Sequence, residues 1–411
     1  MILVTVIAAL ATAGDAEAEP ANLFGHPPCS VVDAHAYGSD PDRDVLAQVA
    51  AQSCRLDPPQ RADALALLAG ERFAFLADPA AGRVTIAARP RGGGAGRAHG
   101  GLNVDLDDLG AGVYASRFRL ARLGEAMLSF YVTPDLQSGA PGAAEAVQIV
   151  HWRGPNAPAL PIAAPDPLGA VETRTLHSES LQETRRLVIY TPPGHDPAGG
   201  PYPVVLMADG GDVHHYGRML DPHIASGRLA PILLVGLVSG QDGIVEDRSE
   251  VSDDLRNVDY LPDFLEPYDR FPAHLVFAAE EATAYAREHF AASAARHETV
   301  VYGRSSGGGF AYHAALRRPD VFGAALAHSP GATVPGEPPA AGVEAAEFHI
   351  AAGLYEPGFL YAARNAEIAL RGQGYDVALT ELAAGHTQEI STATLIDTLS
   401  DLFPGPRRVR P

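Results

Sequence analysis

The chain has 411 residues, and 46% of them are hydrophobic, so it is long and apolar enough to bury a normal core. This composition argues against disorder along most of the chain. Asp and Glu number 50 against 30 for Lys and Arg, which gives a formal net charge of -20. An acidic surface of this kind repels phosphate backbones, so no nucleic-acid partner is expected.

The first residues are typical of an export signal. Residues 1–13 are apolar and end in Ala11-Thr12-Ala13, which fits the small-residue cleavage site of a secretory signal peptide. The apolar run is too short to cross a bilayer as a helix, so no stable membrane anchor is expected. We therefore assign residues 1–19 to a signal peptide and processed region and predict a secreted or periplasmic protein.

Cys29 and Cys54 are the two cysteines of the chain. In an exported protein they could form a disulfide, which would contribute about 3 kcal/mol on the chain-entropy model. The alternative is two unpaired thiols packed as small apolar groups. Two cysteines cannot make a typical structural zinc site, so no metal is predicted there.

Residues 20–152 are expected to form an N-terminal domain with a helical cap and a β-sandwich-like body. Residues 42–68 suggest two short helices joined by a turn at Pro58-Pro59. Residues 72–152 change to short alternating runs, such as 83–88 and 127–132, which predict a compact β-sandwich. The glycines at 92–94 fit a mobile turn better than a phosphate loop, because no strand and helix flank them.

A proline-rich stretch at residues 153–170 predicts a stiff linker. From there to residue 405, apolar runs alternate with helical patterns, which predicts an α/β domain with a mostly parallel sheet covered on both faces. The expected strands are 203–208, 231–238, 299–302, 324–328, 348–352 and 376–382, and the expected helices are 278–290, 308–316, 359–371 and 392–402.

The strongest local signal is the sequence Gly303-Arg304-Ser305-Ser306-Gly307. It stands between a predicted strand and a predicted helix, which is the setting of a nucleophile elbow. The glycines allow the sharp turn that lifts the central serine over the edge of the sheet. Ser305 is therefore the predicted nucleophile, and the backbone N–H of Ser306 is a predicted oxyanion-hole donor.

A serine hydroxyl needs an adjacent base, and in this fold the acid and then the histidine follow the serine along the chain. His386 follows the last predicted strand and precedes a helix, so it is the predicted base; the histidines at 313, 328 and 349 fall in predicted helices or strands. Glu356 follows the strand that ends near residue 352, so it is the predicted acid. The acidic residues at 320, 376 and 381 are more simply solvated charges.

The second oxyanion donor is expected in the loop after an early strand, at the backbone amide of Gly210 or Gly211. The same stretch holds four potential metal ligands, namely Asp209, Asp212, His214 and His215. Loop polarity explains these side chains without a metal, so no metal site is predicted.

Residues 171–404 resemble the enterochelin esterase and feruloyl esterase-like branch of the esterase D family, within the α/β-hydrolases. The segments that carry the resemblance are 187–194, 202–210, 303–309, 353–356 and 385–386. The resemblance assigns Ser305 as nucleophile, Glu356 as acid, His386 as base and the Asp209-Gly210 loop to the oxyanion hole. One departure is Thr387, because family members often carry Asp after the histidine.

The expected reaction is two-step acyl transfer on a small-molecule or glycan ester, with no cofactor. The substrate stays open between siderophore-type esters and aryl or acetyl esters of carbohydrates. Arg248, Arg256 and Arg270 lie before the elbow and could form a local pocket for an anionic substrate. A serine peptidase, an acyltransferase and a non-catalytic carbohydrate-binding protein remain alternatives, and the oligomeric state is not predicted.

Overall fold

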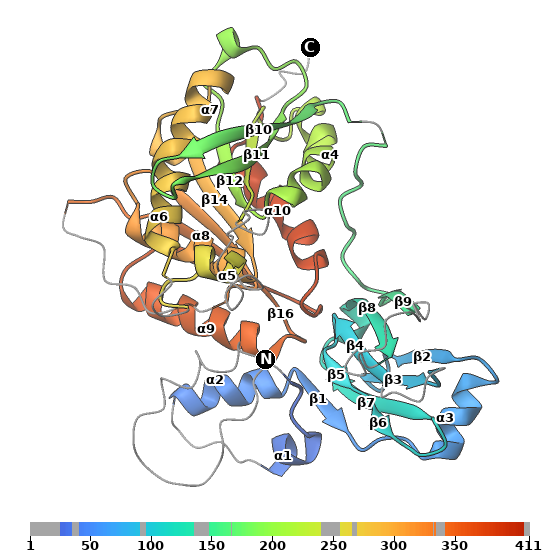
Figure 1. Ribbon diagram of the computed structural model, residues 1–411. Helices are drawn as coiled ribbons and strands as arrows, with labels where there is room; N and C mark the ends of the chain where they lie inside the picture. The colour runs from blue at the N-terminus through green and yellow to red at the C-terminus, as the bar shows by residue number, and fades with distance from the viewer. Residues whose placement is uncertain are drawn as a thin grey trace.

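The computed structural model describes residues 25–34, 41–90, 96–134, 148–165, 167–239, 255–264, 269–331, 333 and 342–406. The predicted signal peptide, the glycines at 92–94 and Arg248 lie outside these residues. Figure 1 shows an α/β domain with a central sheet above a smaller domain rich in β-strands, joined by an extended segment. This arrangement confirms the predicted fold class.

The central sheet has eight strands in the order β10-β11-β13-β12-β14-β15-β16-β17. Its parallel part runs from β13 to β17, whereas β10 and β11 form an antiparallel hairpin at one edge. The bounds are β10 Ala170–Ser178, β11 Glu183–Thr191, β12 Val204–Ala208, β13 Leu233–Leu237, β14 Thr299–Arg304, β15 Ala324–His328, β16 Glu347–Gly353 and β17 Val377–Leu382. All six predicted strands are present.

Helices cover both faces of the sheet because the side chains of each strand alternate between two cores. On β12, Leu206 belongs to the same hydrophobic core as Phe310 of α8, whereas Val205 belongs to the core on the other face, with Leu395 of α10. One face carries α6 Phe271–Val276, a π-helical turn Phe277–Ala282, α7 Thr283–Phe290, α8 Ser306–Arg317 and α9 Pro357–Gly372; the other carries α4 Val213–Ala225 and α10 Glu389–Leu402. The helix predicted at 278–290 is longer in the structure than in the prediction, because α6, the π-helical turn and α7 form one continuous helical segment from 271 to 290.

The N-terminal domain contains two antiparallel sheets that face each other. One has the order β1-β7-β3-β2 with β6 beside β7, and the other has the order β5-β4-β8-β9. Phe75 on β2 meets Phe130 on β8 and Trp152 on β9, so the two sheets share a core. The bounds are β1 Ser53–Leu56, β2 Phe73–Asp78, β3 Arg83–Ala88, β4 Gly96–Gly100, β5 Val104–Asp105, β6 Asp107–Asp108, β7 Tyr114–Leu120, β8 Met127–Pro134 and β9 Gln148–Arg153.

The predicted helical cap is wrong in one respect. Between α2 (Pro41–Ala50) and α3 (Arg61–Leu68) lies the strand β1, which pairs with β7 instead of forming a simple turn. Ser53 and Cys54 are buried in this pairing, and the alternation is too short to be seen in the sequence. The helix α2 lies against α9 of the catalytic domain, and α3 lies against β2 and β3.

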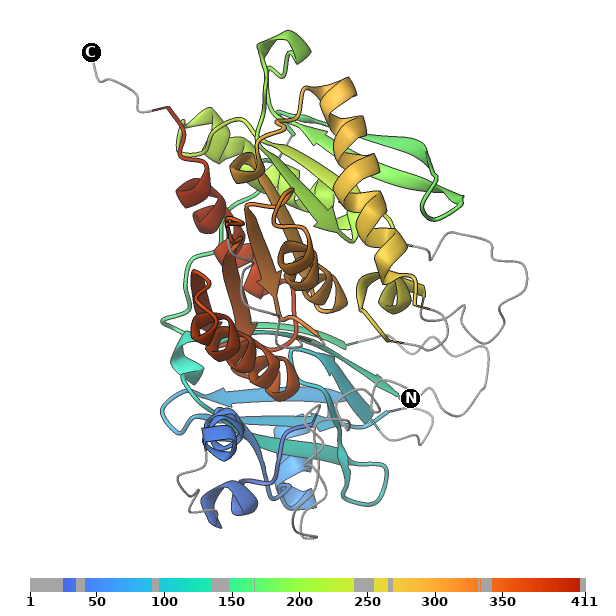
Figure 2. The same cartoon turned by 90° about the vertical axis from the view of Figure 1, so that its left-hand side faces the viewer.

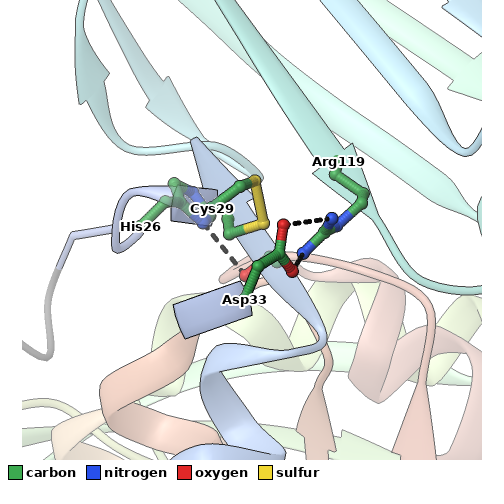
Figure 3. The surroundings of a disulfide bond; sticks show 6 residues. His26, Cys29, Asp33 and Arg119 are labelled. Carbon is green, nitrogen blue, oxygen red and sulfur yellow. Dashed lines mark hydrogen bonds and ion pairs between the residues drawn. A yellow bond between two sulfur atoms is a disulfide. The ribbon is translucent and has the colours of Figure 1, made fainter. Parts of the chain in front are cut away.

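Cys29 and Cys54 form a disulfide, which confirms the bridged alternative (Figure 3). It connects the short helix α1 (Cys29–Ala34) to β1, and Asp33 of that helix pairs with Arg119 on β7 at 2.7 Å. The disulfide and the ion pair together fix the start of the described chain to the first sheet. Among the described residues, no helix is long and apolar enough to span a bilayer.

The linker after β9 has no helix or strand up to β10 among its described residues, as its prolines predict. It is nevertheless fixed at its end, because the guanidinium of Arg218 on α4 donates to the carbonyl oxygens of Ala164 and Pro165 at 2.8 and 3.0 Å. The segment seen along one side of the molecule in Figure 1 is therefore attached to the catalytic domain before β10 begins.

Candidate active site

Ser305 stands on a sharp turn between β14 and α8. Its backbone has φ 60° and ψ -126°, a conformation that side-chain-bearing residues rarely adopt. A Cβ at Gly303 would lie 2.0 Å from the carbonyl oxygen of Gly307, so only glycine lets the strand and the helix approach this closely. The structure thus has the strained elbow that the motif predicts at Ser305.

Glu356 lies just after β16 and occupies the N-cap position of α9, where its side chain makes no capping hydrogen bond to the helix. Its side chain is buried, and its Oε1 accepts hydrogen bonds from the N–H of Gly353 at 2.6 Å and from the hydroxyl of Ser329 at 2.7 Å. Its Oε2 lies 2.6 Å from Nδ1 of His386. A carboxylate held by three partners in this way can fix the orientation of an imidazole.

His386 lies in the loop between β17 and α10. Its ring stacks on the ring of Phe359 from α9, with a centroid separation of 4.0 Å and an interplanar angle of 15°. Gly331 lies between Phe359 and Ser305. Its N–H donates to the carbonyl of Ser305 at 3.0 Å. A Cβ added at Gly331 would lie 3.7 Å from the Phe359 ring. The base and the elbow therefore meet at the same edge of the sheet.

Of the two hydrogen bonds of a triad, the one between Glu356 and His386 is present. The hydroxyl of Ser305 makes no hydrogen bond to His386 among the described residues. Such contacts are often long in enzymes without substrate and shorten when substrate binds. The imidazole of His386, held by Glu356, lies at the same end of the sheet as the half-buried elbow serine, an arrangement that is compatible with nucleophilic acyl transfer.

The predicted oxyanion-hole residues lie at the ends of two neighbouring strands. Ser306 begins α8, and Gly210 begins a 3-10 helix, Gly210–Asp212, directly after β12. N–H groups in the first turn of a helix have no partner within that helix, so the amides of Ser306, Gly210 and Gly211 can point at a ligand. A Cβ at Gly307 would lie 3.1 Å from a carboxylate oxygen of Asp209, so the two strand ends are in contact.

The N-terminal domain touches the loop that carries His386. The N–H of Met127, at the start of β8, donates to the carbonyl of Ala383 at 2.8 Å. A Cβ at Gly385 would lie only 1.7 Å from the carbonyl oxygen of Gly101, so the two backbones are in direct contact next to His386. We call this the Gly101–Gly385 contact. Figure 2 shows the β-rich domain directly beneath the catalytic domain.

The other histidines after the elbow have structural surroundings. His313 is buried against the ring of Phe271, and His349 faces Glu347 at 2.9 Å. His328 is buried with Nδ1 2.9 Å from the hydroxyl of Ser391, and burial lowers its pKa to about 3. The side chains of His328 and His349 make no interaction with Ser305 or Glu356 in the described structure, although the backbone carbonyl of His328 accepts the N–H of Ser305 at 3.0 Å.

The acidic residues that the sequence analysis set aside also have other surroundings. Asp320 is bound by Arg318 at 2.9 Å, a hydrogen bond that lowers the pKa of Asp320. Glu381 is paired with Arg364 at 2.6 Å, and Asp376 is exposed before β17. The contact with His386 thus distinguishes Glu356 from every other acid that was considered.

The predicted arginine pocket is not assembled by the described members of the set. Arg256 is paired with Asp209 at 2.6 Å, and Arg270 is paired with Asp259 and Glu183 at 2.8 and 2.6 Å. Within the described ranges, no three His, Cys, Asp or Glu side chains are grouped to hold a metal, and Asp209 is already bound by Arg256. His214 and His215 are exposed on α4.

Sequence reasoning missed several residues around the site. Ser329 directly follows β15 and supports Glu356, and its backbone has φ 43°. Asn257 and Tyr260 belong to a short helix, α5 (Leu255–Tyr260), that no periodic pattern predicted, and Arg256 of the same helix was considered only for a substrate pocket. The position of Ser329 at the carboxyl end of a predicted strand is the one signal that could have marked it.

Residues 178–347 match the Esterase family model, whose description reads "Putative esterase". A search of curated proteins found no match. Among solved structures, the enterobactin esterase of Shigella flexneri in the presence of enterobactin is 19% identical, with a TM-score of 0.55 over 78% of this chain and 92% of that chain. The ferric enterobactin esterase of Salmonella typhimurium is 16% identical, with a TM-score of 0.58 over 82% and 98% of the two chains.

A ferulic acid esterase of Anaeromyces mucronatus, solved in complex with ferulic acid, is also similar. It is 18% identical, with a TM-score of 0.46 over 56% of this chain and 90% of that chain. The similarity to the two enterobactin esterases covers both domains and shows that this chain shares their fold. The similarity to the ferulic acid esterase is weaker and adds nothing to this conclusion about the fold.

Proposed function

We propose that this protein, an ester hydrolase with an α/β-hydrolase catalytic domain, cleaves carboxylic esters with a triad of Ser305, His386 and Glu356. The observation that carries the proposal is the contact of 2.6 Å between Glu356 and His386 at the sheet edge where the Ser305 elbow stands. Nucleophile, acid and base follow the ends of β14, β16 and β17, which is the chain order of this fold.

The proposed reaction has two steps. His386 takes the hydroxyl proton as Ser305 attacks the ester carbonyl, and the N–H groups of Ser306 and of Gly210 or Gly211 stabilise the oxyanion. The C–O bond to the alcohol breaks as His386 returns the proton to the leaving oxygen. Water then attacks the acyl-enzyme with His386 as base, which releases the acid and restores Ser305. Glu356 holds the imidazole in the required tautomer throughout.

We infer that a siderophore-type ester is the first substrate to test. Two enterobactin esterases share the fold of both domains, and the alignment spans 92% and 98% of their chains. Aryl or acetyl esters of carbohydrates are the second candidate. The net charge of -20 offers no long-range attraction to an anionic siderophore, and Arg256 and Arg270 are already paired with carboxylates, whereas a neutral ester needs no such attraction.

The decisive experiment compares hydrolysis of p-nitrophenyl acetate and butyrate by the wild type, Ser305→Ala and Ser226→Ala. Ser226 lies at the end of α4 and binds the carbonyl of His223, so it serves as a control serine outside the site. Loss of activity in Ser305→Ala alone, with a fluorophosphonate adduct mapped to Ser305 in the wild type, supports the triad. Undiminished hydrolysis by Ser305→Ala would refute it. A peptide amide and an added alcohol acceptor test the peptidase and acyltransferase alternatives.

We further infer that the protein is exported. The Cys29–Cys54 disulfide supports this, because disulfides persist in oxidising compartments. Fractionation of cells that make the full chain tests the inference: processed protein in the periplasm or medium supports it, and unprocessed protein confined to the cytosol contradicts it.

A further inference from the structure

The helix α5 lies in the segment between β13 and β14, and three of its side chains reach the proposed oxyanion hole. Arg256 and Tyr260 contact the turn that contains Asp209, and Asn257 contacts Ser306. These two regions supply the two sets of backbone amides proposed above. One short helix therefore contacts both halves of the hole.

The turn after β12 needs support because its backbone is strained. Asp209 has φ 61° and ψ 68°, a left-handed conformation that is unfavourable for a residue with a side chain. Arg256 holds its carboxylate with two hydrogen bonds of 2.6 Å each, from Nε to Oδ1 and from Nη2 to Oδ2. The N–H of Asp209 donates to the hydroxyl of Tyr260 at 2.9 Å. Both the side chain and the backbone of Asp209 are thus fixed by α5.

The elbow side of the hole is held by the same helix. Nη2 of Arg256 also donates to the carbonyl of Arg304 at 3.2 Å, one residue before the nucleophile. The hydroxyl of Ser306 donates to Oδ1 of Asn257 in a short hydrogen bond. The guanidinium of Arg256 lies 5.3 Å from the ring centroid of Tyr260, so the clamping side chains also support one another.

We propose that α5 is a clamp for the oxyanion hole, in which Arg256, Asn257 and Tyr260 are positioning residues that fix the Asp209-Gly210 turn against the start of α8. This inference rests on the proposed esterase function. Preorganised donors stabilise an oxyanion because they need no rearrangement during the reaction, so anything that fixes their direction contributes to the rate. In this proposal, α5 has a role in catalysis, which is to hold the oxyanion-hole amides in position.

A direct role for Arg256 in binding an anionic substrate fits the contacts less well. Its Nε and Nη2 atoms are taken by Asp209 and Arg304, and the charge of Asp209 balances its own. The two roles predict different kinetics. A substrate-binding arginine affects mainly KM for anionic esters, whereas a clamp affects kcat for neutral esters as well.

The test uses the full chain with p-nitrophenyl butyrate, a neutral ester, and compares Arg256→Met, Arg256→Lys, Tyr260→Phe and Arg318→Met. Arg318 is a matched control, because it makes a two-bond pair with Asp320 and its side chain is 22% exposed against 23% for Arg256. It follows α8 and precedes β15, so it lies at the opposite edge of the sheet from the elbow.

Loss of one oxyanion donor costs about 100- to 1000-fold in kcat, so partial misalignment should cost about 10- to 100-fold. We expect that loss in Arg256→Met and in Arg256→Lys, which keeps the charge but not the paired hydrogen bonds. Tyr260→Phe removes only the hydroxyl and should lower kcat about 3- to 10-fold. KM should change less than kcat, and affinity for a trifluoromethyl ketone, which forms a tetrahedral oxyanion on the nucleophile, should fall in parallel.

Unchanged kcat in both Arg256→Met and Tyr260→Phe would overturn the clamp, as would an equal loss in Arg318→Met or a change in KM alone. Tyr260→Phe decides the question if Arg256→Met does not fold, since it keeps the buried ring. Failure of the clamp is distinct from failure of the esterase proposal, because only the latter leaves Ser305→Ala as active as the wild type.

Discussion

The hydroxyl of Ser329 donates a hydrogen bond of 2.7 Å to Oε1 of Glu356, and both side chains are buried. The same oxygen accepts the N–H of Gly353, while the other oxygen faces His386. The two oxygens of Glu356 therefore have separate tasks. One is held by the backbone and side chain at the ends of β16 and β15, and the other contacts His386, the proposed base.

Replacing Ser329 tests whether this hydrogen bond matters for catalysis. Ser329→Ala leaves a buried acceptor with one partner fewer, which costs about 1–3 kcal/mol and should lower kcat about 5- to 100-fold with little change in KM. Ser329→Gly also removes the hydroxyl but relieves the positive φ of 43°. Equal kinetic losses in the two variants would assign the effect to the hydroxyl, and wild-type kinetics in either would contradict it.

The Gly101–Gly385 contact predicts that the N-terminal domain fixes the position of His386, the proposed base. In Gly385→Ala the added methyl would meet the Gly101 backbone, so the loop or the domain must move. A displacement of about 1 Å at a catalytic group can cost about 100-fold, so kcat/KM should fall by about 10- to 100-fold. Gly372→Ala is the control, because a Cβ there has no neighbour within 4 Å. Similar steady-state kinetics for the two variants would rule out this role.

Removing the disulfide should lower stability without removing any active-site group. Cys29 and Cys54 are 25 residues apart, and a bridge of this loop length contributes about 3 kcal/mol on the chain-entropy model. The double variant Cys29→Ser, Cys54→Ser should therefore unfold at lower urea concentration than the oxidised wild type. Reduced wild type should match the variant, and a reductant should have no effect on the variant. Equal unfolding midpoints for oxidised wild type and variant would contradict the prediction.

Two buried histidines predict a loss of stability in mild acid. Burial lowers the pKa of His328 to about 3 and that of His274 to about 4, whereas both groups titrate near 6.5 in the unfolded chain. Below pH 6.5 the unfolded state therefore binds more protons, so the free energy of unfolding falls as the pH drops toward the folded pKa values. Each histidine contributes up to about 1.4 kcal/mol per pH unit in that window.

Urea unfolding between pH 7 and pH 5 measures this effect. His274 lies among the rings of Tyr260, Phe277 and Phe310, so His274→Phe keeps an aromatic side chain there and removes one titrating group. The dependence of the unfolding free energy on pH should become shallower in this variant. An unchanged slope would show that His274 does not contribute.

The parts of the site that the sequence could predict are those with local signals. The elbow at Ser305 needs glycines at fixed spacing between a strand and a helix, and the loop of His386 follows a clear apolar strand. Both signals lie within a few residues of the proposed catalytic side chain, and the structure has a strand, a connecting loop and a helix at each place. The buried strands of the parallel sheet were predicted for the same reason, since they read as continuous apolar runs.

The parts that could not be predicted depend on contacts between distant residues. Arg256 and Asp209 are 47 positions apart, and neither side chain differs in kind from an ordinary surface charge. The sequence does not predict the hairpin β10–β11, because β10 lacks an apolar run and its residues are mostly exposed or half-buried, although β11 has an apolar run at 187–190. Gly101 and Gly385 are glycines in a chain that has 42, so only packing reveals that their backbones meet.

The Gly101–Gly385 contact also bears on how this enzyme could be taken apart or recombined. A catalytic domain cut at the linker would lose the backbone against which its histidine loop rests. A foreign N-terminal domain grafted in its place would have to present a backbone of the same shape to Gly385, where there is no room for a side chain. The two domains thus meet as one structural unit at the loop of His386, and the linker is not a point at which either domain can be exchanged without remaking that contact.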